Sequence, residues 1–310
     1  MKTLALTVGV VIWLTTSALA WNHFGHLTVA AIAYDHLTPK VRTTVDGLLK
    51  LNPSYKQWVA GVAAQDKRKV AFMRAATWPD LIKTSAMGYQ NDGERPTGPD
   101  AARNIGYADK LMHRYWHFID RPFSPDHAGL LEPDSPNAQT QISAFRATLT
   151  DPHASKELKS YDLVWLLHLV GDVHQPLHAT SRFDQQQPKG DRGGNAVKLC
   201  TKPTSCEGKL HAFWDDVLGT SDSYKTAITK AKALTPADAH LAAIPDEVVW
   251  IEESFQAAQQ TVYAAPVGVG EGPYTLDTAY KTAARELAER RIALAGRRLA
   301  NLLNDAMCPG

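Results

Sequence analysis

The sequence has few cysteines and no excess of charge of either sign. Three cysteines occur among 310 residues, too few for a disulfide-based scaffold. Lys and Arg total 33 against 32 Asp and Glu, so the chain lacks the polybasic character of proteins that bind duplex DNA through its backbone. Any affinity for anions must therefore be local.

Long hydrophobic runs are also scarce. Leu4 to Leu14 is the most apolar stretch, and at about eleven residues it is too short to span a membrane, which needs roughly twenty. Lys2 precedes it and Ala18-Leu19-Ala20 follows it, as in a secretory signal peptide. We expect residues 1–20 to be removed and the protein to be secreted or periplasmic. Cleavage would leave Trp21 with a free α-amino group, and we expect no membrane association.

An oxidising compartment bears on the cysteines. Cys200 and Cys206 are close enough in sequence to close a small disulfide loop, and Cys308 is left over near the C-terminus. Three free thiols are the alternative.

The composition, 44% hydrophobic and 21% charged, is that of a globular protein with a sizeable core. Helical periodicity dominates, and strand signals are scarce. The clearest helical segments are 27–37, 142–149, 162–173, 248–262 and 276–303. Loops rich in Pro and Gly are predicted at about 85–104, 120–137, 183–209 and 264–274. We expect a mainly α fold whose one β element is a hairpin near Asn195 to Leu199. No composition shift or repeat divides the chain, so 21–310 is predicted to be a single domain.

One helical segment carries an unusual polar pair. His168 and Asp172 are four residues apart, which places both side chains on one helix face. The surrounding residues are apolar enough for a core helix, where an unpaired carboxylate would cost several kcal/mol. A bound metal would supply the missing positive charge. A His–Asp hydrogen bond in the core is the alternative.

The same spacing recurs at His211 and Asp215. Pro176 is predicted to end the central helix and to let His178 turn back toward the cluster. Asp80, His117 and the pair formed by Trp21 and His26 are further candidates for metal ligands. His174 lies inside the same segment but off the helix face. The histidines with no such pattern, expected to be surface or structural groups, are His23, His36, His113, His127, His153 and His240.

Six short motifs give the chain a resemblance to a known family. They are WNHFGH at 21–26, WPD at 78–80, WHFID at 116–120, HLVGDVHQPLH at 168–178, GDRGGN at 190–195 and LHAFWD at 210–215. In this order they closely resemble the type I nucleases, the zinc-dependent, single-strand-specific nucleases of fungi, plants and bacteria typified by mung bean nuclease. The lack of an Asn-x-Ser/Thr sequon favours a bacterial member. The resemblance implies the multi-helix fold shared by phospholipase C and these nucleases.

The resemblance also implies three zinc sites. The first would be held by Asp80, His117, His168 and Asp172, the second by His178, His211 and Asp215, and the third by the Trp21 amine and carbonyl, His26 and Asp172. Asp172 would then bridge two ions. Nitrogen and carboxylate ligands suit zinc, in agreement with the reading from spacing alone.

By the same resemblance the protein is a secreted, monomeric endonuclease that hydrolyses single-stranded DNA and RNA to 5′-phosphate ends and also acts on 3′-nucleotides. Three dications outweigh the charge of three aspartates, and a positively charged cavity suits a phosphodiester. The implied catalytic residues are Asp80, Lys83 and Asp172. The implied substrate contacts are Phe118, Asp120, Lys83, Phe183, Asn195 and Asp216. Where fungal members carry Asn, this chain has Asp216.

Two other functions fit part of the pattern. A zinc-dependent phospholipase C shares the scaffold and the N-terminal Trp, but it has a longer gap between that Trp and the first His and ends its last ligand pair with Glu rather than Asp215. A non-catalytic exported zinc-binding protein would carry flexible His-rich tracts, whereas here single ligands are spread over a helical chain.

Overall fold

The computed structural model describes residues 21–202 and 204–307. The predicted signal peptide, residues 1–20, and Cys308 lie outside the described residues. Mainly helical structure is observed, as predicted. The α-helices are α1 His23–Asp35, α2 Pro39–Leu49, α3 Tyr55–Trp58, α4 Lys67–Ala75, α5 Trp78–Leu81, α6 Ala138–Thr150, α7 Lys156–Asp172, α8 Leu210–Asp216, α9 Tyr224–Ala233, α10 Ala239–Ala242, α11 Glu247–Ala257 and α12 Thr278–Met307. A π-helical turn, Ala258–Val262, extends α11, and the short 3₁₀ helices include η4 Arg114–His117 and η5 Pro176–His178.

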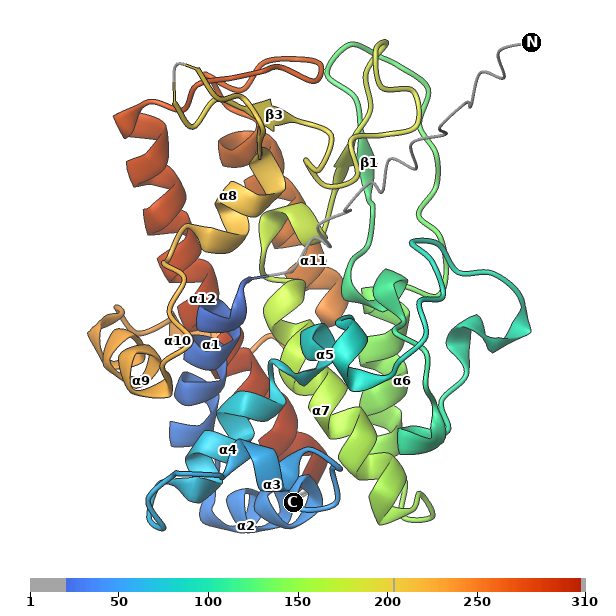
Figure 1. Ribbon diagram of the computed structural model, residues 1–310, viewed down its shortest axis with the longest axis vertical. Helices are drawn as coiled ribbons and strands as arrows, with labels where there is room; N and C mark the ends of the chain where they lie inside the picture. The colour runs from blue at the N-terminus through green and yellow to red at the C-terminus, as the bar shows by residue number, and fades with distance from the viewer. Residues whose placement is uncertain (1–20, 203, 308–310) are drawn as a thin grey trace, which may run out of the picture.

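The central helix is α7. Every residue from Ser160 to Asp172 is buried, because α7 packs against α6, α2, α12 and α1. Ser155 caps its N-terminus by accepting a hydrogen bond from the backbone amide of Leu158. Figure 1 shows α7 running through the middle of the molecule, with α1 and α12 beside it. A helix that is apolar all round is thus covered on all sides, as its sequence requires.

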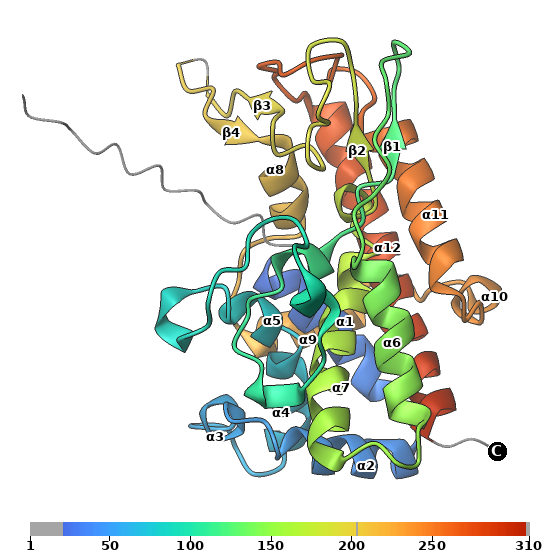
Figure 2. The same cartoon turned by 90° about the vertical axis from the view of Figure 1, so that its right-hand side faces the viewer.

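The short strands gather at one end of the molecule. Figures 1 and 2 show β1 and β3 with their long loops at the end opposite α2 and α3. The strands are β1 Pro122–Phe123, β2 Ser181–Arg182, β3 Lys198–Leu199 and β4 Gly208–Lys209. The antiparallel pair of β3 and β4 provides the predicted hairpin, and a disulfide joins Cys200 to Cys206 within it. The prediction of a disulfide between these cysteines is therefore confirmed.

Two details of the sequence prediction are wrong. The hairpin is not the one β element, because β1 pairs with β2 in parallel, with Pro122 opposite Ser181. Pro176 does not end the central helix. α7 already ends at Asp172, where short-range hydrogen bonds from the amides of His174 and Gln175 close a tight turn, and Pro176 begins η5 instead.

Buried ion pairs connect the C-terminal helix to the centre. Arg298 of α12 is fully buried and donates hydrogen bonds to both carboxylate oxygens of Glu253 on α11, at 2.6 and 2.7 Å. The same guanidinium lies 3.1 Å from Nε2 of His174. His174 therefore belongs to this structural network, just beyond the end of α7.

We predict that Arg298→Met lowers the free energy of unfolding by about 3 kcal/mol, because it removes two of the hydrogen bonds to the Glu253 carboxylate, which keeps the one from Arg291, and leaves His174 Nε2 without its donor. Urea unfolding followed by circular dichroism measures the loss. Arg290→Met, on an exposed part of the same helix, is the matched control and should change stability by less than about 0.5 kcal/mol. Equal stability of the two variants would contradict the structural role of the pair.

Candidate metal centre and substrate cavity

Six separate segments bring imidazoles and carboxylates together near the C-terminal end of α7. Three groups have ligand atoms within 4.8 Å of one another: His26 with Asp80 and His168, His117 with His168 and Asp172, and His178 with His211 and Asp215. These are the His and Asp residues singled out from the sequence. The segments that supply them are α1, α5, η4, α7, η5 and α8.

Asp172 belongs to the second of these groups and also lies beside His26 of the first. Its Oδ1 is 3.2 Å from Nε2 of His26, and its Oδ2 is 3.1 Å from Nδ1 of His117 and 3.2 Å from Nε2 of His168. The rings of His26 and His168 stack with their centroids 3.9 Å apart. One carboxylate therefore faces three imidazoles in a space from which solvent is excluded.

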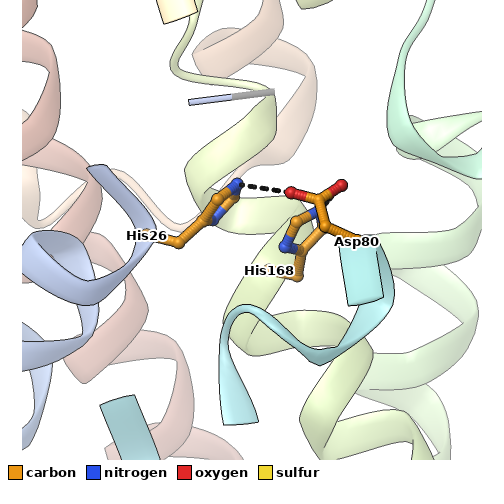
Figure 3. Close-up of side chains that lie close together, drawn as sticks. All are labelled: His26, Asp80 and His168. Atoms are coloured by element: carbon orange, nitrogen blue, oxygen red, sulfur yellow. Dashed lines mark ion pairs between the residues drawn. The ribbon is translucent and has the colours of Figure 1, made fainter. Parts of the chain in front are cut away.

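Asp80 enters the same space from α5. Its carboxylate lies 4.0 Å from Nε2 of His26 and 3.6 Å from Nε2 of His168. Figure 3 shows these three side chains pointing toward one another from different helices. Lys83, one helical turn later, pairs with Asp80 at 2.6 Å, and its side chain is 4% exposed. The predicted catalytic residues Asp80, Lys83 and Asp172 are thus gathered around one point.

The third group shows most clearly how the ring nitrogens are oriented toward a common point. Nδ1 of His178 lies 2.8 Å from the carbonyl of His117, and Nδ1 of His211 lies 2.6 Å from the carbonyl of Gly193. A carbonyl only accepts, so each Nδ1 carries a proton, and in a neutral ring Nε2 then presents a lone pair. The two Nε2 atoms nevertheless lie 3.1 Å apart. Two lone pairs at this distance repel each other unless a cation lies between or beside them.

His168 is oriented in the same way. Its Nδ1 lies 2.7 Å from the carbonyl of Ala76, which leaves Nε2 to face Asp172 and Nδ1 of His117. Backbone carbonyls therefore fix the ring orientation in both halves of the cluster, as they do for metal-binding histidines in general.

Asp215 completes the third group. Its Oδ2 lies 3.5 Å from Nε2 of His211, and its Oδ1 accepts a hydrogen bond of 2.8 Å from the amide of Gln175. The Gln175 side chain also accepts from the backbone amide of Leu177 at 2.6 Å. The turn that follows α7 thus holds Asp215 in place.

Burial controls the protonation of these groups. Because burial disfavours a charged imidazole, it lowers the pKa of His26 to about 4 and that of His117 to about 3. Although burial opposes ionisation of Asp172, the histidines around it hold the pKa of its carboxyl well below the usual range. Burial raises the pKa of Asp215 well above that range. At neutral pH His26 and His117 therefore offer unprotonated imidazoles beside the ionised carboxylate of Asp172. Burial opposes a charged His168, but the charges of Asp172 and Asp80 outweigh this effect and raise its pKa.

These residues fit divalent metal ions. Oδ2 of Asp80, Oδ1 of Asp172 and Nε2 of His117 are buried without a hydrogen-bond partner among the described residues. Buried carboxylates without partners are costly, and a coordinated cation removes that cost. Nitrogen and carboxylate donors are the ligands that zinc prefers.

Trp21 lies beside the cluster. A Cβ atom added at Gly171 would lie 3.0 Å from Nδ1 of His26 and 4.0 Å from the Trp21 ring. The next backbone amide, that of Asn22, donates to the carbonyl of Asp215 at 3.3 Å. The start of the predicted mature chain is thus close to His26 and Asp215. The free amine predicted there depends on cleavage within residues that the structure does not describe.

A cavity of about 680 Å³ opens above the metal-ligand side chains. His117, His178 and His211 lie on its surface, and so do four of the predicted substrate contacts, Lys83, Phe118, Asp120 and Asn195. Partial burial, with Asp191 and Asp134 nearby, raises the pKa of Asp120 to about 7.

Two of the predicted substrate contacts do not line this cavity. Phe183 is buried behind its wall, where a Cβ atom added at Gly190 would lie 2.9 Å from the Phe183 ring. Asp216 accepts a hydrogen bond of 2.7 Å from the side chain of Asn22 instead. Both are near the site without facing it.

The sequence analysis missed the basic residues of the cavity wall. Besides Lys83, these are Arg95, Arg114, Lys189, Arg192 and Lys209. One of them, Arg192, belongs to the GDRGGN motif that carried the family resemblance, so its position in that motif was the available signal. The others come from loops, from the 3₁₀ helix η4 and from strand β4, and their arrangement depends on tertiary structure.

Comparisons with known proteins relate the chain to nucleases. The family model described as S1/P1 Nuclease matches residues 21–308. Endonuclease 3 of Arabidopsis thaliana is 27% identical over 212 residues, 66% of this chain and 56% of that protein. Nuclease S1 of Aspergillus oryzae is 25% identical over 201 residues, 63% of this chain and 53% of that protein. Endonuclease 5 of Arabidopsis thaliana is 27% identical over 225 residues, 70% of this chain and 62% of that protein. The alignments therefore span between half and two thirds of each curated relative.

We predict that Asp172→Asn reduces the metal content of the purified protein by about two ions per chain, because the two carboxylate oxygens of Asp172 face His26 on one side and His117 and His168 on the other. Plasma mass spectrometry after desalting measures the content. Asp162→Asn is the matched control, since Asp162 is buried on the same helix but hydrogen-bonds Asn104 outside the cluster. Full metal content in D172N would contradict the central position of Asp172.

Proposed function

Because residues 21–308 match its family model, the chain belongs to the S1/P1 nuclease family, and we propose that it is a zinc-dependent endonuclease acting on single-stranded DNA and RNA. The observation that carries the proposal is the pair of facing Nε2 atoms of His178 and His211, 3.1 Å apart, beneath a cavity lined by basic residues. That arrangement suits a cation and an anionic substrate at the same place. The nuclease names of its relatives support the reaction class.

Three zinc ions per chain are part of the proposal. The first is assigned to Asp80, His117, His168 and Asp172, the second to His178, His211 and Asp215, and the third to Trp21, His26 and Asp172. Zinc ions, when bound, supply an activated water at neutral pH and neutralise charge on a phosphodiester. The protein holds the ligands in orientation through the carbonyls of Ala76, His117 and Gly193.

Lys83 is proposed to act on the phosphate. Its ammonium lies at the edge of the cavity and is held against Asp80 at 2.6 Å. With its side chain 4% exposed, it is largely desolvated and presents its charge in a fixed position. Such a fixed cation stabilises negative charge that develops on the phosphate oxygens in the transition state.

The preference for single strands has a proposed structural source. The ligand groups are recessed, so a phosphate reaches them only when its nucleotide leaves the base stack, and unpairing a duplex adds a cost. Phe118 on the cavity wall offers a ring for the freed base, and the carboxyl of Asp120 offers a hydrogen-bond partner. The products are proposed to carry 5′-phosphates, and 3′-nucleotides are proposed as further substrates.

The proposed location is outside the cytoplasm, in the periplasm or the medium. The disulfide between Cys200 and Cys206 supports it, because structural disulfides persist in oxidising compartments. Within the described part of the chain, the helices are too short or too polar to cross a bilayer. We propose that the mature protein is one nuclease domain and a monomer.

A direct assay tests the proposal. The zinc-loaded protein should cleave single-stranded DNA and RNA at least about tenfold faster than duplex DNA, since unpairing a base costs a few kcal/mol. A chelator should abolish the activity, and added zinc should restore it. Lecithin, the substrate of the rival phospholipase activity, should not be hydrolysed. Hydrolysis of lecithin without cleavage of nucleic acid would contradict the proposal.

A second prediction concerns the N-terminus. Retention of one extra residue before Trp21 should remove one zinc ion per chain and slow cleavage about 10²-fold or more, because the α-amino group can no longer act as a ligand. Mass spectrometry defines the N-terminus, and metal analysis with kinetics measures the effect. The helical circular dichroism spectrum should not change. Three zinc ions and full activity in the extended protein would show that Trp21 only packs in the core.

A further inference from the structure

Two stretches of the chain that differ in charge line the cavity above the metal-ligand side chains, and they are named its first and second walls. The first wall comes from residues 83–134, and its charged side chains are Lys83, Glu94, Arg95, Arg114, Asp120 and Asp134. The second wall comes from residues 189–209, and its charged side chains are Lys189, Arg192 and Lys209. The first wall therefore carries no formal net charge when its acids are ionised, and the second carries three positive charges.

Local pairing increases this difference. On the first wall, Arg95 pairs with Asp134 at 3.4 Å and Arg114 pairs with Glu94 at 2.8 Å. Lys83 is likewise held by Asp80 below the wall. All three cations of the first wall thus already have a carboxylate partner.

The cations of the second wall are less closely paired. Arg192 acts electrostatically on Asp120 of the first wall. Within residues 21–202 and 204–307, no ion pair is observed for Lys189, Arg192 or Lys209. The nearest acid in sequence, Asp191, is buried and accepts hydrogen bonds from the Tyr263 hydroxyl and the Arg182 amide. It is therefore engaged behind the wall. The charge of the second wall remains available to an anion in the cavity.

Arg192 occupies a backbone position that favours glycine. Its φ is 54°, in the left-handed region, and its neighbours Gly190, Gly193 and Gly194 have φ values of 78°, 59° and 77°. Arginine is strained in such a conformation, whereas glycine is not. Strain of this kind persists where the surrounding structure imposes it, and it is most often found at functional sites. Arg192 is exposed and lines the cavity, and it directly precedes Gly193, whose carbonyl orients His211.

We propose that the second wall binds the phosphates that flank the scissile phosphate, so that a single strand lies with its backbone along Lys189, Arg192 and Lys209 and its bases toward Phe118 on the first wall. This inference rests on the proposed nuclease function. It adds which side of the cavity the backbone of the strand occupies and which side its bases occupy. It makes the second wall the part of the site that distinguishes a polynucleotide from a shorter substrate. Arginine and lysine bind phosphates without reading sequence, so base preference is not set there.

The test compares substrates with and without flanking phosphates. One substrate is a single-stranded 20-mer, and the other is a dinucleoside monophosphate, which carries the scissile phosphate alone. For the double variant Lys189→Gln/Arg192→Gln, the ratio of kcat/KM for the 20-mer to that for the dinucleotide should fall about tenfold near 0.1 M salt. The slope of log KM for the 20-mer against log salt concentration should decrease by about 1.4, since each phosphate contact on a single strand contributes about 0.7.

Three further variants separate charge from folding. Arg192→Lys keeps the charge, so its ratio of kcat/KM for the 20-mer to that for the dinucleotide should stay close to the wild-type value. Arg192→Gly removes the charge at a backbone position that glycine tolerates, so the ratio should fall while the Tm stays within a few degrees of the wild type. Arg285→Gln, on an exposed part of α12 outside the cavity, is the matched control and should leave the ratio unchanged.

The inference is overturned if the double variant keeps the wild-type kcat/KM ratio and salt slope. It is also overturned if the ratio falls as far in Arg192→Lys as in Arg192→Gly. A second readout separates it from the proposed function. Fluorescence anisotropy of a phosphorothioate 20-mer measures binding to the zinc-loaded protein, and the double variant should bind about tenfold more weakly. A wild-type protein that binds the strand through this wall but cleaves neither substrate would refute the nuclease proposal and support the binding surface.

Discussion

The burial of Asp172 in the central helix is the constraint on which the rest of the structure depends. An ionised carboxylate in a core is stable only when positive charge or several donors compensate it. Here the carboxylate faces imidazoles on three elements, His26 of α1, His117 of η4 and His168 of α7 itself. The surroundings of the Asp172 carboxylate thus depend on how α1 and η4 pack against the end of α7. Divalent cations between these groups would satisfy the carboxylate and the bare ring nitrogens together.

Irregular segments of the chain then set the orientation of the ligands. His168, His178 and His211 each donate Nδ1–H to a backbone carbonyl, and two of those carbonyls belong to the non-helical residues Ala76 and Gly193. A Cβ atom at Gly193 would lie 2.3 Å from the carbonyl of Leu177, so the loop approaches η5 too closely for any other residue. The same loop carries Arg192 to the cavity. The loop that contains Gly193 therefore both orients a ligand histidine and carries part of the charge of the second wall.

The parts of the site that depend on local spacing could be predicted from the sequence. Helical pairs four residues apart, such as His168 with Asp172, fix a common face before any tertiary contact forms. The parallel pairing of β1 with β2 could not be predicted, because strands of two residues carry no periodicity and their partners are distant in sequence. His113 was predicted to be a surface or structural group. It is structural, buried between Asp92 and Asp109 and stacked on an indole ring. The charge difference between the cavity walls likewise follows from tertiary ion pairs rather than from composition.

The central claim is that the three ligand groups around the end of α7 each hold a zinc ion. Anomalous diffraction at the zinc absorption edge, from crystals of the mature protein grown with zinc, tests it most directly. The account predicts three peaks, two of them adjacent to Asp172 and the third between His178, His211 and Asp215. A single peak, or peaks away from these side chains, would contradict it.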